Sequence, residues 1–309
     1  MSASPGPPMN ASQGPPVRGA GAERLGGHVP LPADLDAVFT AAGAAAWGAV
    51  SYARVAPLMS PENRDRAQAL CPGAATAFAA AFPYYAGERP GNLSLYARGA
   101  DYHPALVRRL TPVCDFLHVK YPEYSFLPAA DSSPLPEREI AWLAGLGLRG
   151  ENGLFILPPW GSYLFLGTIL TAAPFDPPPA QPAPACLGCG RCRRACPTGA
   201  LGGIEQMFHV KQCLSDLTQR KGALTGEEAA LLRAHPYVWG CDLCQRCCPY
   251  NAAPRETQLP EFREDLTDFL TAGMLEGLTN RAFRARYGDR AFAWRGPAVL
   301  RRNLAVKDE

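Results

Sequence analysis

Nine of the 11 cysteines in this 309-residue chain fall between Cys186 and Cys248. The first four follow the spacing Cys-x2-Cys-x2-Cys-x3-Cys-Pro, which is typical of bacterial ferredoxins. In that motif three thiolates wrap one cubane cluster, and the fourth binds a second cubane. Zinc also accepts four thiolates, but the complete run with its final proline favours two [4Fe–4S] clusters.

The rest of the region supplies the further ligands that a second cluster needs. Cys213 is followed by a Cys-x2-Cys-x3-Cys-Pro run whose last cysteine mirrors the one before Pro197. We therefore assign one cluster to Cys186, Cys189, Cys192 and Cys248, and the other to Cys196, Cys213, Cys241 and Cys244. Cys247 has no proline after it and is interpreted as a small buried residue beside the cluster. Paired clusters usually conduct electrons, although a purely structural role stays open.

Composition restricts the class of protein more loosely. Hydrophobic residues make up 47% of the chain and the formal net charge is +2, which is typical of a globular protein and gives no support for a nucleic-acid or membrane partner. The N-terminus lacks the basic and apolar regions of a signal peptide, and no apolar run reaches the roughly 18 residues that span a bilayer. We therefore expect a cytoplasmic protein with reduced cysteines and no membrane contact.

Proline and glycine mark the expected boundaries between segments. The first residues contain almost no large apolar side chains, and a proline-rich stretch precedes the first cysteine. The expected organisation is a disordered tail over 1–31, an α/β domain over 32–175, a linker over 176–185, a two-cluster domain over 186–255 and a basic helical segment over 256–309.

Hydrophobic periodicity predicts the main elements. Helices are expected within 32–48 (with the Ala-rich run 37–53 read as a packed helix), over 104–121 and over 137–148. Strands are expected over 74–85 and 152–159. Two short helices are expected near the C-terminus, over 261–275 and 279–287.

Several stretches in a fixed order resemble the epoxyqueuosine reductase family. Besides the cysteine runs they are YARGADYH (96–103), ADSSPLPEREIAWLAGLGLRGENGLFI (130–156), GSYLFLGTIL (161–170), CLSDLT (213–218) and WGCDLCQRCCPYN (239–251). The resemblance runs from about Arg64 to Val306 and so covers most of the chain.

The resemblance implies an α+β fold. In it a mixed α/β corrinoid-binding domain, like those of reductive dehalogenases and nitroreductases, precedes a ferredoxin-like double-cluster domain and a short helical C-terminus. It also implies a cobalamin-dependent oxidoreductase that reduces epoxyqueuosine to queuosine at the wobble position of tRNA. The implied partners are a tRNA anticodon loop and an external low-potential electron donor, and we expect a monomer.

The same resemblance assigns roles to particular residues. Asp131 matches the proton donor, and its enclosure by the corrinoid would raise the pKa of its carboxyl group. From the sequence alone Asp131 is an Asx-turn or cap residue, and Glu137 and Arg138 form an ion pair. Gly161 is expected to let the backbone approach a flat ligand. Tyr102 and His103 are expected near the pocket, and the matched corrinoid contacts are Arg64, Ser94, Asp131, Ser162, Ser215, Cys241 and Asp242.

The chain departs from the family pattern at three points. Glu151 stands where a lysine is usual, Asp216 stands where an aromatic residue is usual, and the sequence ends at Glu309 without the helical repeats of many members. Each departure removes a contact suited to a polyanion.

The segment 281–309 offers a substitute, because it carries eight basic and three acidic residues. Tyr287, Phe292 and Trp294 lie among them and are candidates for stacking on unpaired bases. The alternative is a solvated helix face. Two other functions stay open: an electron carrier without catalysis, and a corrinoid reductase of a small epoxide or halide.

Overall fold

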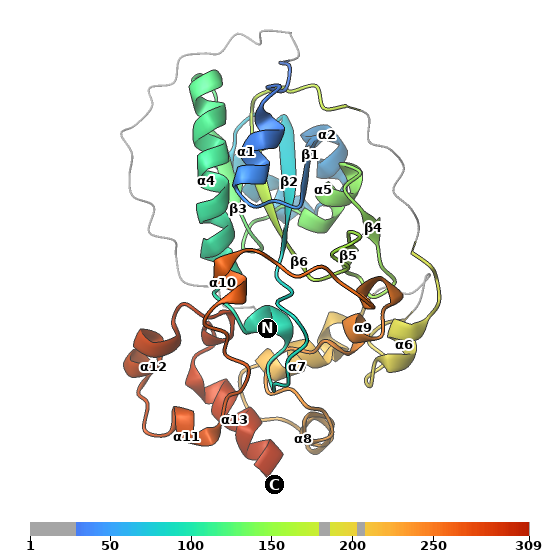
Figure 1. Cartoon of the computed structure of the whole chain (residues 1–309), viewed down its shortest axis with the longest axis vertical. Coiled ribbons are helices and arrows are strands. Elements are labelled where there is room, and N and C mark those ends of the chain that lie inside the picture. Colours follow the sequence, from blue (N-terminus) through green and yellow to red (C-terminus); the bar gives the residue numbers. More distant parts are fainter. Residues whose placement is uncertain (1–28, 179–185, 203–207, 309) are drawn as a thin grey trace.

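A computed structural model describes residues 29–178, 186–202 and 208–308 of the chain. Figure 1 shows an α/β unit above a helical unit that contains the cysteine-rich region. Within the described residues, none of the helices combines the length and the apolar character needed to cross a bilayer.

A four-stranded antiparallel sheet forms the centre of the α/β unit, in the order β1-β2-β6-β3. Its central strand β2 (Thr76–Pro83) is buried along its whole length. Phe78 and Phe82 face one hydrophobic cluster, whereas the alternate alanines Ala77, Ala79 and Ala81 face another, as the two-residue period of a strand requires. The other strands are β1 (Ala46–Ser51), β3 (Phe126–Ala129) and β6 (Leu164–Thr171).

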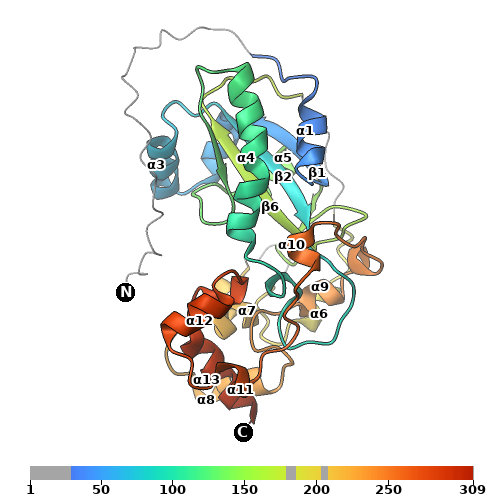
Figure 2. The same ribbon diagram turned by 60° about the vertical axis from the view of Figure 1, so that its left-hand side comes forward.

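Helices cover both faces of this sheet (Figure 1). The long helix α4 (Tyr102–Lys120) and α1 (Leu35–Ala41) pack on the face of Phe78. On the other face lie α2 (Tyr52–Val55), α3 (Pro61–Leu70) and α5 (Glu137–Leu143), with α3 at the outer edge in Figure 2.

The expected strand 74–85 and helix 104–121 are confirmed as β2 and α4. The helix expected over 32–48 is only partly correct, and the packed helix expected over 37–53 is wrong. The chain turns at Gly43, whose φ of 87° lies in the left-handed region, and continues as β1. Every residue of β1 pairs with the buried strand β2, and this pairing overrides the helical preference of alanine.

Two other expected elements are shorter than the sequence suggests. The helix over 137–148 ends at Leu143, and the segment after it forms a two-stranded ladder of β4 (Leu148–Arg149) and β5 (Phe155–Ile156).

Near the C-terminus one expected helix is confirmed and the other is wrong. The helix over 279–287 is α12 (Asn280–Tyr287). The helix over 261–275 is instead α10 (Pro260–Arg263) and α11 (Ala272–Leu275), separated by Asp265, which has a left-handed φ of 50°.

The remaining helices build the lower unit. They are α6 (Arg191–Ala195), α7 (Leu214–Gln219), α8 (Gly226–Arg233), α9 (Leu243–Arg246) and α13 (Pro297–Asp308). Single 3₁₀ turns occur at Ala56–Leu58, Leu95–Ala97, Val210–Gln212, Pro249–Asn251 and Ala291–Ala293.

The two units exchange chain segments. Leu93 and Ala97, which follow β2, are buried in the lower core beside Trp239. In return, Leu259 and Phe262 pack in the core of the α/β unit. The expected segment 256–309 therefore packs into the α/β core, and its later residues share the lower core with Trp239 across the boundary at residue 256.

The segments expected to be unstructured lie mostly outside the described residues. Residues 1–28 and 179–185 are not described. Val29 pairs with Phe175 beside the sheet, so the folded part begins before the expected boundary at residue 32.

Candidate active site and cluster-binding region

The second predicted set of cysteines, here called group two, comes together beneath the α/β unit. The pKa of the Cys241 thiol is raised to about 12. Burial is the largest cause, and the negative charges of Asp242, Cys213 and Cys196 raise the pKa further. Burial and the charges of Cys241 and Cys213 raise the pKa of Cys244 further. These electrostatic effects require the four cysteines to be neighbours, as the sequence assignment predicts.

The first predicted set, group one, lines a small cavity between α6 and α9. Cys186, Cys189, Cys192 and Cys248 all contribute to its wall, and Cys247 does not. The thiol of Cys247 instead donates to the carbonyl oxygen of Cys244 at 3.5 Å. Cys248 therefore lines the group-one cavity, whereas Cys247 lies beside it, close enough for its charge to raise the pKa of Cys192.

The surroundings of Cys196 fit a bound thiolate. Burial alone would raise the pKa of this thiol, but hydrogen bonds from the Thr198 hydroxyl and from the backbone N–H groups of Thr198, Ala200 and Leu201 lower it. No three His, Cys, Asp or Glu side chains of the described residues lie close enough to hold a single metal ion. Both cysteine groups offer sulfur donors alone, which is the ligand set of [4Fe–4S] clusters.

Glu151 brings a buried carboxylate into the wall of group one, where Arg193 is its ion-pair partner. Its side chain is only 8% exposed, and Arg193 Nε lies 3.5 Å from Oε2. Neither carboxylate oxygen has a hydrogen-bond partner within the described residues. Burial raises the pKa of the neighbouring Cys192, and the charge of Glu151 adds to that rise. The charge of Glu151 therefore affects the cysteines of group one. It does not lie on an exposed surface where it would repel a polyanion.

Three of the predicted corrinoid contacts lie in a buried polar network that joins the two units. The Ser94 hydroxyl donates to Asp242 Oδ1 at 2.5 Å, and the Leu95 N–H donates to Oδ2 at 2.8 Å. The Ser162 hydroxyl donates to Gln245 Oε1 at 2.9 Å. Ser94 and Asp242 have no exposed surface and Ser162 is 4% exposed, so their side chains hold the junction together.

Glycines permit the close approach at this junction. Gly240 has a φ of 74°, and a Cβ atom there would lie 2.4 Å from the Cβ of Ser94. At Gly161 a Cβ would meet Asn251 Oδ1 at 1.9 Å. The expectation that Gly161 admits a flat ligand is therefore wrong in this structure, because the space is taken by Asn251.

Asp131 lies where β3 leaves the sheet, and its side chain is 60% exposed. The Tyr102 hydroxyl donates to Asp131 Oδ2 at 2.5 Å, and His103 Nε2 lies 3.2 Å from the same oxygen. The other ring nitrogen of His103 lies 2.7 Å from Asp101 Oδ1. Although burial alone would lower it, hydrogen bonds to Asp101 and Asp131 raise the pKa of His103 to about 9.

Without a corrinoid beside it, the carboxyl group of Asp131 has a pKa below its ordinary value; the rise expected on enclosure by the corrinoid stays a prediction. The hydrogen bond from His103 is the largest effect and lowers the pKa of Asp131, with further lowering by Tyr102, while burial opposes both. At neutral pH the proton therefore sits on the imidazole of His103 and the carboxylate carries the charge.

Glu137 is a second carboxyl group of this site that the sequence interpretation assigned differently. Its Oε1 accepts a hydrogen bond from the Asp131 N–H at 2.5 Å, and burial raises the pKa of Glu137 to about 8. Arg138 donates to the Gly153 carbonyl oxygen. No Glu137–Arg138 ion pair forms in the described chain, so that expectation is wrong; the side chain of Glu137 supports the turn at Asp131.

A short series of contacts links group two to Asp131. Ser215, two residues after Cys213, accepts a hydrogen bond from the Gln219 side chain, which also donates to the Tyr96 hydroxyl at 3.2 Å. The ring of Tyr96 packs edge-on against Tyr102, with 6.5 Å between centroids. Tyr96 and Tyr102 lie in the family-like stretch 96–103 and Ser215 is a matched contact, but nothing in the sequence indicated that Gln219 connects Ser215 to Tyr96.

Arg64 is not brought to this site by any described contact. It lies on α3 at the outer edge of the α/β unit, and its guanidinium donates to the Ala56 carbonyl oxygen at 3.4 Å (Figure 2). Asp216 is likewise occupied, because it forms an ion pair with Arg220 at 2.8 Å.

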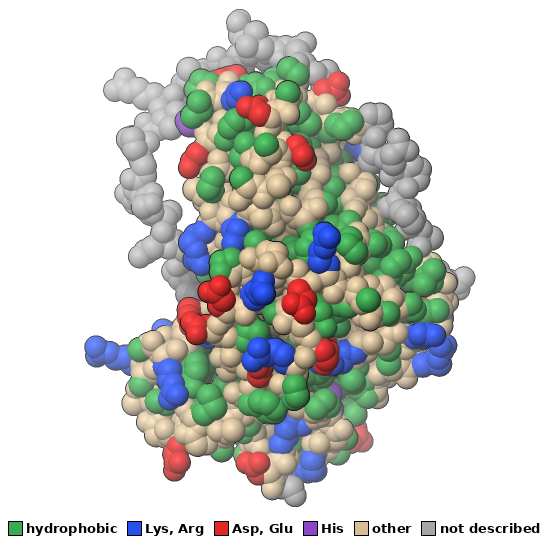
Figure 3. Space-filling view, in the orientation of Figure 1, with side chains coloured by type: hydrophobic (Ala, Val, Ile, Leu, Met, Phe, Trp, Pro, Cys, Tyr) green, Lys and Arg blue, Asp and Glu red, His purple; other side chains and the backbone are tan. Residues whose placement is uncertain are grey.

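The basic C-terminal segment is only partly available to a ligand. Tyr287 and Phe292 are 6% and 0% exposed, so the expectation that they stack on bases is wrong; Trp294 is 57% exposed. Arg301 and Lys307 donate to backbone carbonyl oxygens. On the face in Figure 3, basic side chains remain visible over α12 and α6.

Fold and site together define an α/β domain joined to a cysteine-rich iron–sulfur domain. Residues 185–251 match the family model described as "4Fe-4S double cluster binding domain", which confirms the prediction of two [4Fe–4S] clusters. Residues 64–132 match the model described as "Epoxyqueuosine reductase QueG, DUF1730". The chain belongs to the epoxyqueuosine reductase family, as the sequence resemblance indicates.

Curated relatives carry the same name. The epoxyqueuosine reductase of Listeria monocytogenes is 36% identical over 223 residues, which are 71% of this chain and 57% of the relative. That of Bacillus cereus is 35% identical over 265 residues, 79% of this chain and 66% of the relative. That of Gloeobacter violaceus is 34% identical, over 75% of this chain and 68% of the relative. The first two relatives are thus matched over less than two thirds of their own length.

Solved structures agree on the fold. A selenomethionine-labelled epoxyqueuosine reductase superposes with a TM-score of 0.77 at 27% identity, over 89% of this chain and 80% of that one. An epoxyqueuosine reductase with a tRNA-Tyr epoxyqueuosine-modified stem loop gives a TM-score of 0.76 at 26% identity, with the same coverage. The predicted α+β fold with a double-cluster domain and a helical C-terminus is confirmed.

Proposed function

We propose that this protein reduces the epoxide of epoxyqueuosine to queuosine at the wobble position of tRNA. The epoxide oxygen leaves as water, so each turnover consumes two electrons and two protons and converts the epoxide carbons to an alkene. The electrons come one at a time from an external low-potential donor. The curated relatives, and the related structure that holds a modified tRNA stem loop, support this substrate.

The observation that carries the proposal is the series of contacts between group two and Asp131. The series begins near the cluster-binding region and ends at the exposed carboxylate of Asp131. In order, its members are Cys213, Ser215, Gln219, Tyr96 and Tyr102. Reduction of an epoxide needs electrons and protons at the same place. The series brings the cluster-binding region, which supplies electrons, close to Asp131, which supplies a proton.

We propose that a corrinoid binds on the solvent-accessible side of Asp131 and group two, and not among the buried residues of the junction. Of the matched contacts, Asp131 is exposed and Ser215 and Cys241 are half-buried, and we propose that these three touch it. Ser94, Ser162 and Asp242 would position them from behind. Held by these residues, cobalamin would supply the low-potential redox chemistry that opening a C–O bond needs.

The chain's own residues manage the protons. We propose that Asp131 passes a proton to the epoxide oxygen and is resupplied by His103, which Asp101 holds in its charged form. Tyr102 fixes the orientation of the carboxylate through its hydroxyl. The pKa of Glu137, about 8, makes it a second proton reserve at neutral pH.

The proposal also covers the location of the protein, its oligomeric state and its domain boundaries. We propose that the protein acts in the cytoplasm as a monomer. Its domains are proposed as the tail 1–31, the α/β domain 32–175, the linker 176–185, the two-cluster domain 186–255 and the segment 256–309, with packing across the last boundary.

Nucleoside mass spectrometry tests the function directly. Cells without the gene are expected to accumulate epoxyqueuosine in tRNA and to lose queuosine, and the gene is expected to reverse this. Anaerobically reconstituted protein with cobalamin and a chemical reductant is expected to perform the conversion in vitro. Unchanged queuosine in the deletion strain, together with no conversion in vitro, would leave a small epoxide or halide as the substrate.

A further inference from the structure

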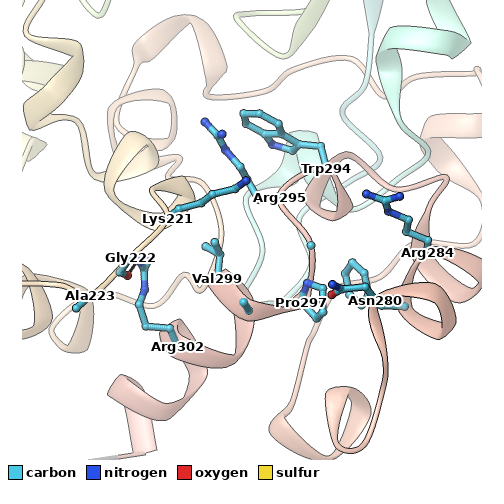
Figure 4. Close-up of a pocket in the computed structure, with 13 residues that line it drawn as sticks. Lys221, Gly222, Ala223, Asn280, Arg284, Trp294, Arg295, Pro297, Val299 and Arg302 are labelled. Atoms are coloured by element: carbon cyan, nitrogen blue, oxygen red, sulfur yellow. Dashed lines mark hydrogen bonds between the residues drawn. The ribbon is translucent and has the colours of Figure 1, made fainter. Parts of the chain in front are cut away.

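A cavity in the lower unit plays no part in the site described above. It has a volume of about 570 Å³ and lies between α12, the segment leading into α13, and the loop after α7. Figure 4 shows Lys221 and Arg284 reaching it from opposite sides, with Trp294 and Arg295 between them. We call it the Trp294 pocket. It shares no residue with the cysteine groups or with the surroundings of Asp131.

Positive charge collects in this pocket without compensation. None of the residues that line it is acidic. No described residue forms an ion pair or a side-chain hydrogen bond with Lys221 or Arg284, and both are exposed. The Nε of Arg295 is buried and has no hydrogen-bond partner within the described chain. Cations that converge without partners repel one another, so the pocket is suited to an anion.

A fourth cation, Arg302, holds the loop after α7 in place at the edge of the pocket. Arg302 donates at 2.7 Å to the carbonyl oxygens of both Arg220 and Gly222, on either side of Lys221. Its charge is therefore used to hold the loop in place, while Lys221 remains available to a ligand.

Trp294 adds an aromatic surface to this charge. Its side chain is 57% exposed, and the guanidinium of Arg295 lies 3.6 Å from the ring centroid. Cations beside an exposed ring are the combination with which proteins hold single-stranded nucleic acid, by phosphate contacts and by base stacking. The volume also falls within the 300–1,000 Å³ or so of a small-molecule site.

We propose that the Trp294 pocket binds one unpaired nucleotide of an RNA, with its base on Trp294 and its phosphate beside Lys221, Arg284 and Arg295. This rests on the proposed function, because it adds a contact to the tRNA at a distance from the epoxide. It also accounts for RNA binding by a chain whose net charge is only +2.

The test measures binding of a fluorescently labelled anticodon stem-loop RNA to the full chain with its clusters reconstituted. Reversing two charges, K221E with R284E, is expected to weaken binding at least tenfold. It should also reduce the slope of log K against log salt by about 1.4, which is two single-strand phosphate contacts. Trp294→Ala is expected to cost about 5- to 150-fold.

Arg286→Glu is the control matched to Arg284→Glu alone, because each reversal changes the net charge by the same amount. Arg286 is exposed on the same helix, two residues from Arg284 and hence about 200° around it, and it does not line the pocket. The control should change affinity less than twofold, and all variants should keep the iron content of the parent. Equal losses in the control and in the pocket variants would overturn the proposal, because net charge alone would then explain binding.

Competition separates the pocket from the proposed function. If the parent reduces epoxyqueuosine in tRNA but the pocket variants bind the stem-loop normally, the pocket proposal fails and the function stands. Displacement of the RNA from the parent by AMP or inorganic phosphate at equal concentration would indicate a free-nucleotide site and also overturn it. If the stem-loop binds with the expected pocket dependence but is not reduced, the pocket stands and the proposed reaction fails.

Discussion

The two cysteine groups occupy unlike surroundings. In group one Cys189 is exposed and its neighbour Leu187 is 61% exposed, beside the basic helix α6. In group two none of the cysteines is exposed, and burial raises the pKa of Cys241 to about 12. Within the described residues, the contacts that lead to Asp131 start from group two. We therefore expect electrons to enter at group one and to leave from group two.

The largest expected effect comes from removing one ligand of each group. The parent should hold about eight irons per chain, and Cys244→Ala should lose one cluster and all turnover. Cys248→Ala should instead lose the other cluster, which removes the route for an external donor. Iron analysis and EPR of each variant check this, with Cys114→Ala, a buried cysteine of the α/β core, as the control. Four irons or bound zinc in the parent would contradict the assignment.

Replacing Asp131 tests the part of the site that is connected to group two. Asp131→Asn keeps the shape of the side chain but cannot pass on a proton, so turnover should fall about 10²- to 10⁴-fold. Cluster and cobalamin content should not change, as iron analysis and the visible spectrum would show. Activity within about threefold of the parent would return Asp131 to the role of a turn residue, and loss of cobalamin would make it a binding residue.

The pH dependence tests the same end. His103 faces Asp101, Asp131 and Tyr102, and the first two raise its pKa to about 9. Its proton is therefore available through neutral pH and is lost as the pH rises through 9, where the rate should begin to fall by about tenfold per unit. Measurements of kcat between pH 6 and 10 check this. His103→Gln should be slow throughout and lack the break near 9; a break that persists in this variant belongs to another group.

The double-cluster region and the main secondary structure were within reach of the sequence, because both rest on local spacing. The Cys-x2-Cys runs constrain a tight loop around a cluster, and Phe78 and Phe82 alternate with alanines as a buried strand should. The error at β1 has a physical cause: an alanine run suits a helix or a strand, and pairing with β2 decides between them.

The site was predictable only in part, because long-range contacts determine its chemistry. Asp131 could be matched to the family, but its low pKa depends on His103, 28 residues away. Ser94 and Asp242 could be matched as polar residues near a pocket, yet a separation of 148 residues hides that they bond to each other. Likewise, nothing in the spacing shows that Glu151 faces group one.

Glu151 offers a smaller test of the comparison. A negative charge beside a cluster disfavours the addition of an electron, so Glu151→Gln should raise the reduction potential of the group-one cluster. Arg193→Gln should shift it the opposite way, because it removes the compensating charge. An anaerobic redox titration followed by EPR measures both. The group-two cluster should stay unchanged in both variants, and a shift confined to it would exclude this electrostatic explanation.

Cys247 should give the smallest effect and is the sharpest check on which cysteines belong to group one. It lies next to Cys248, yet it is absent from the wall of the group-one cavity and its thiol donates to the Cys244 carbonyl oxygen. Replacing it by alanine removes a weak hydrogen bond and no ligand, so iron content, both EPR signals and turnover should match the parent. A loss of about four irons would show that Cys247 binds the cluster in place of Cys248. In that event Cys248→Ala should be harmless, so the two variants together decide the fourth ligand of group one.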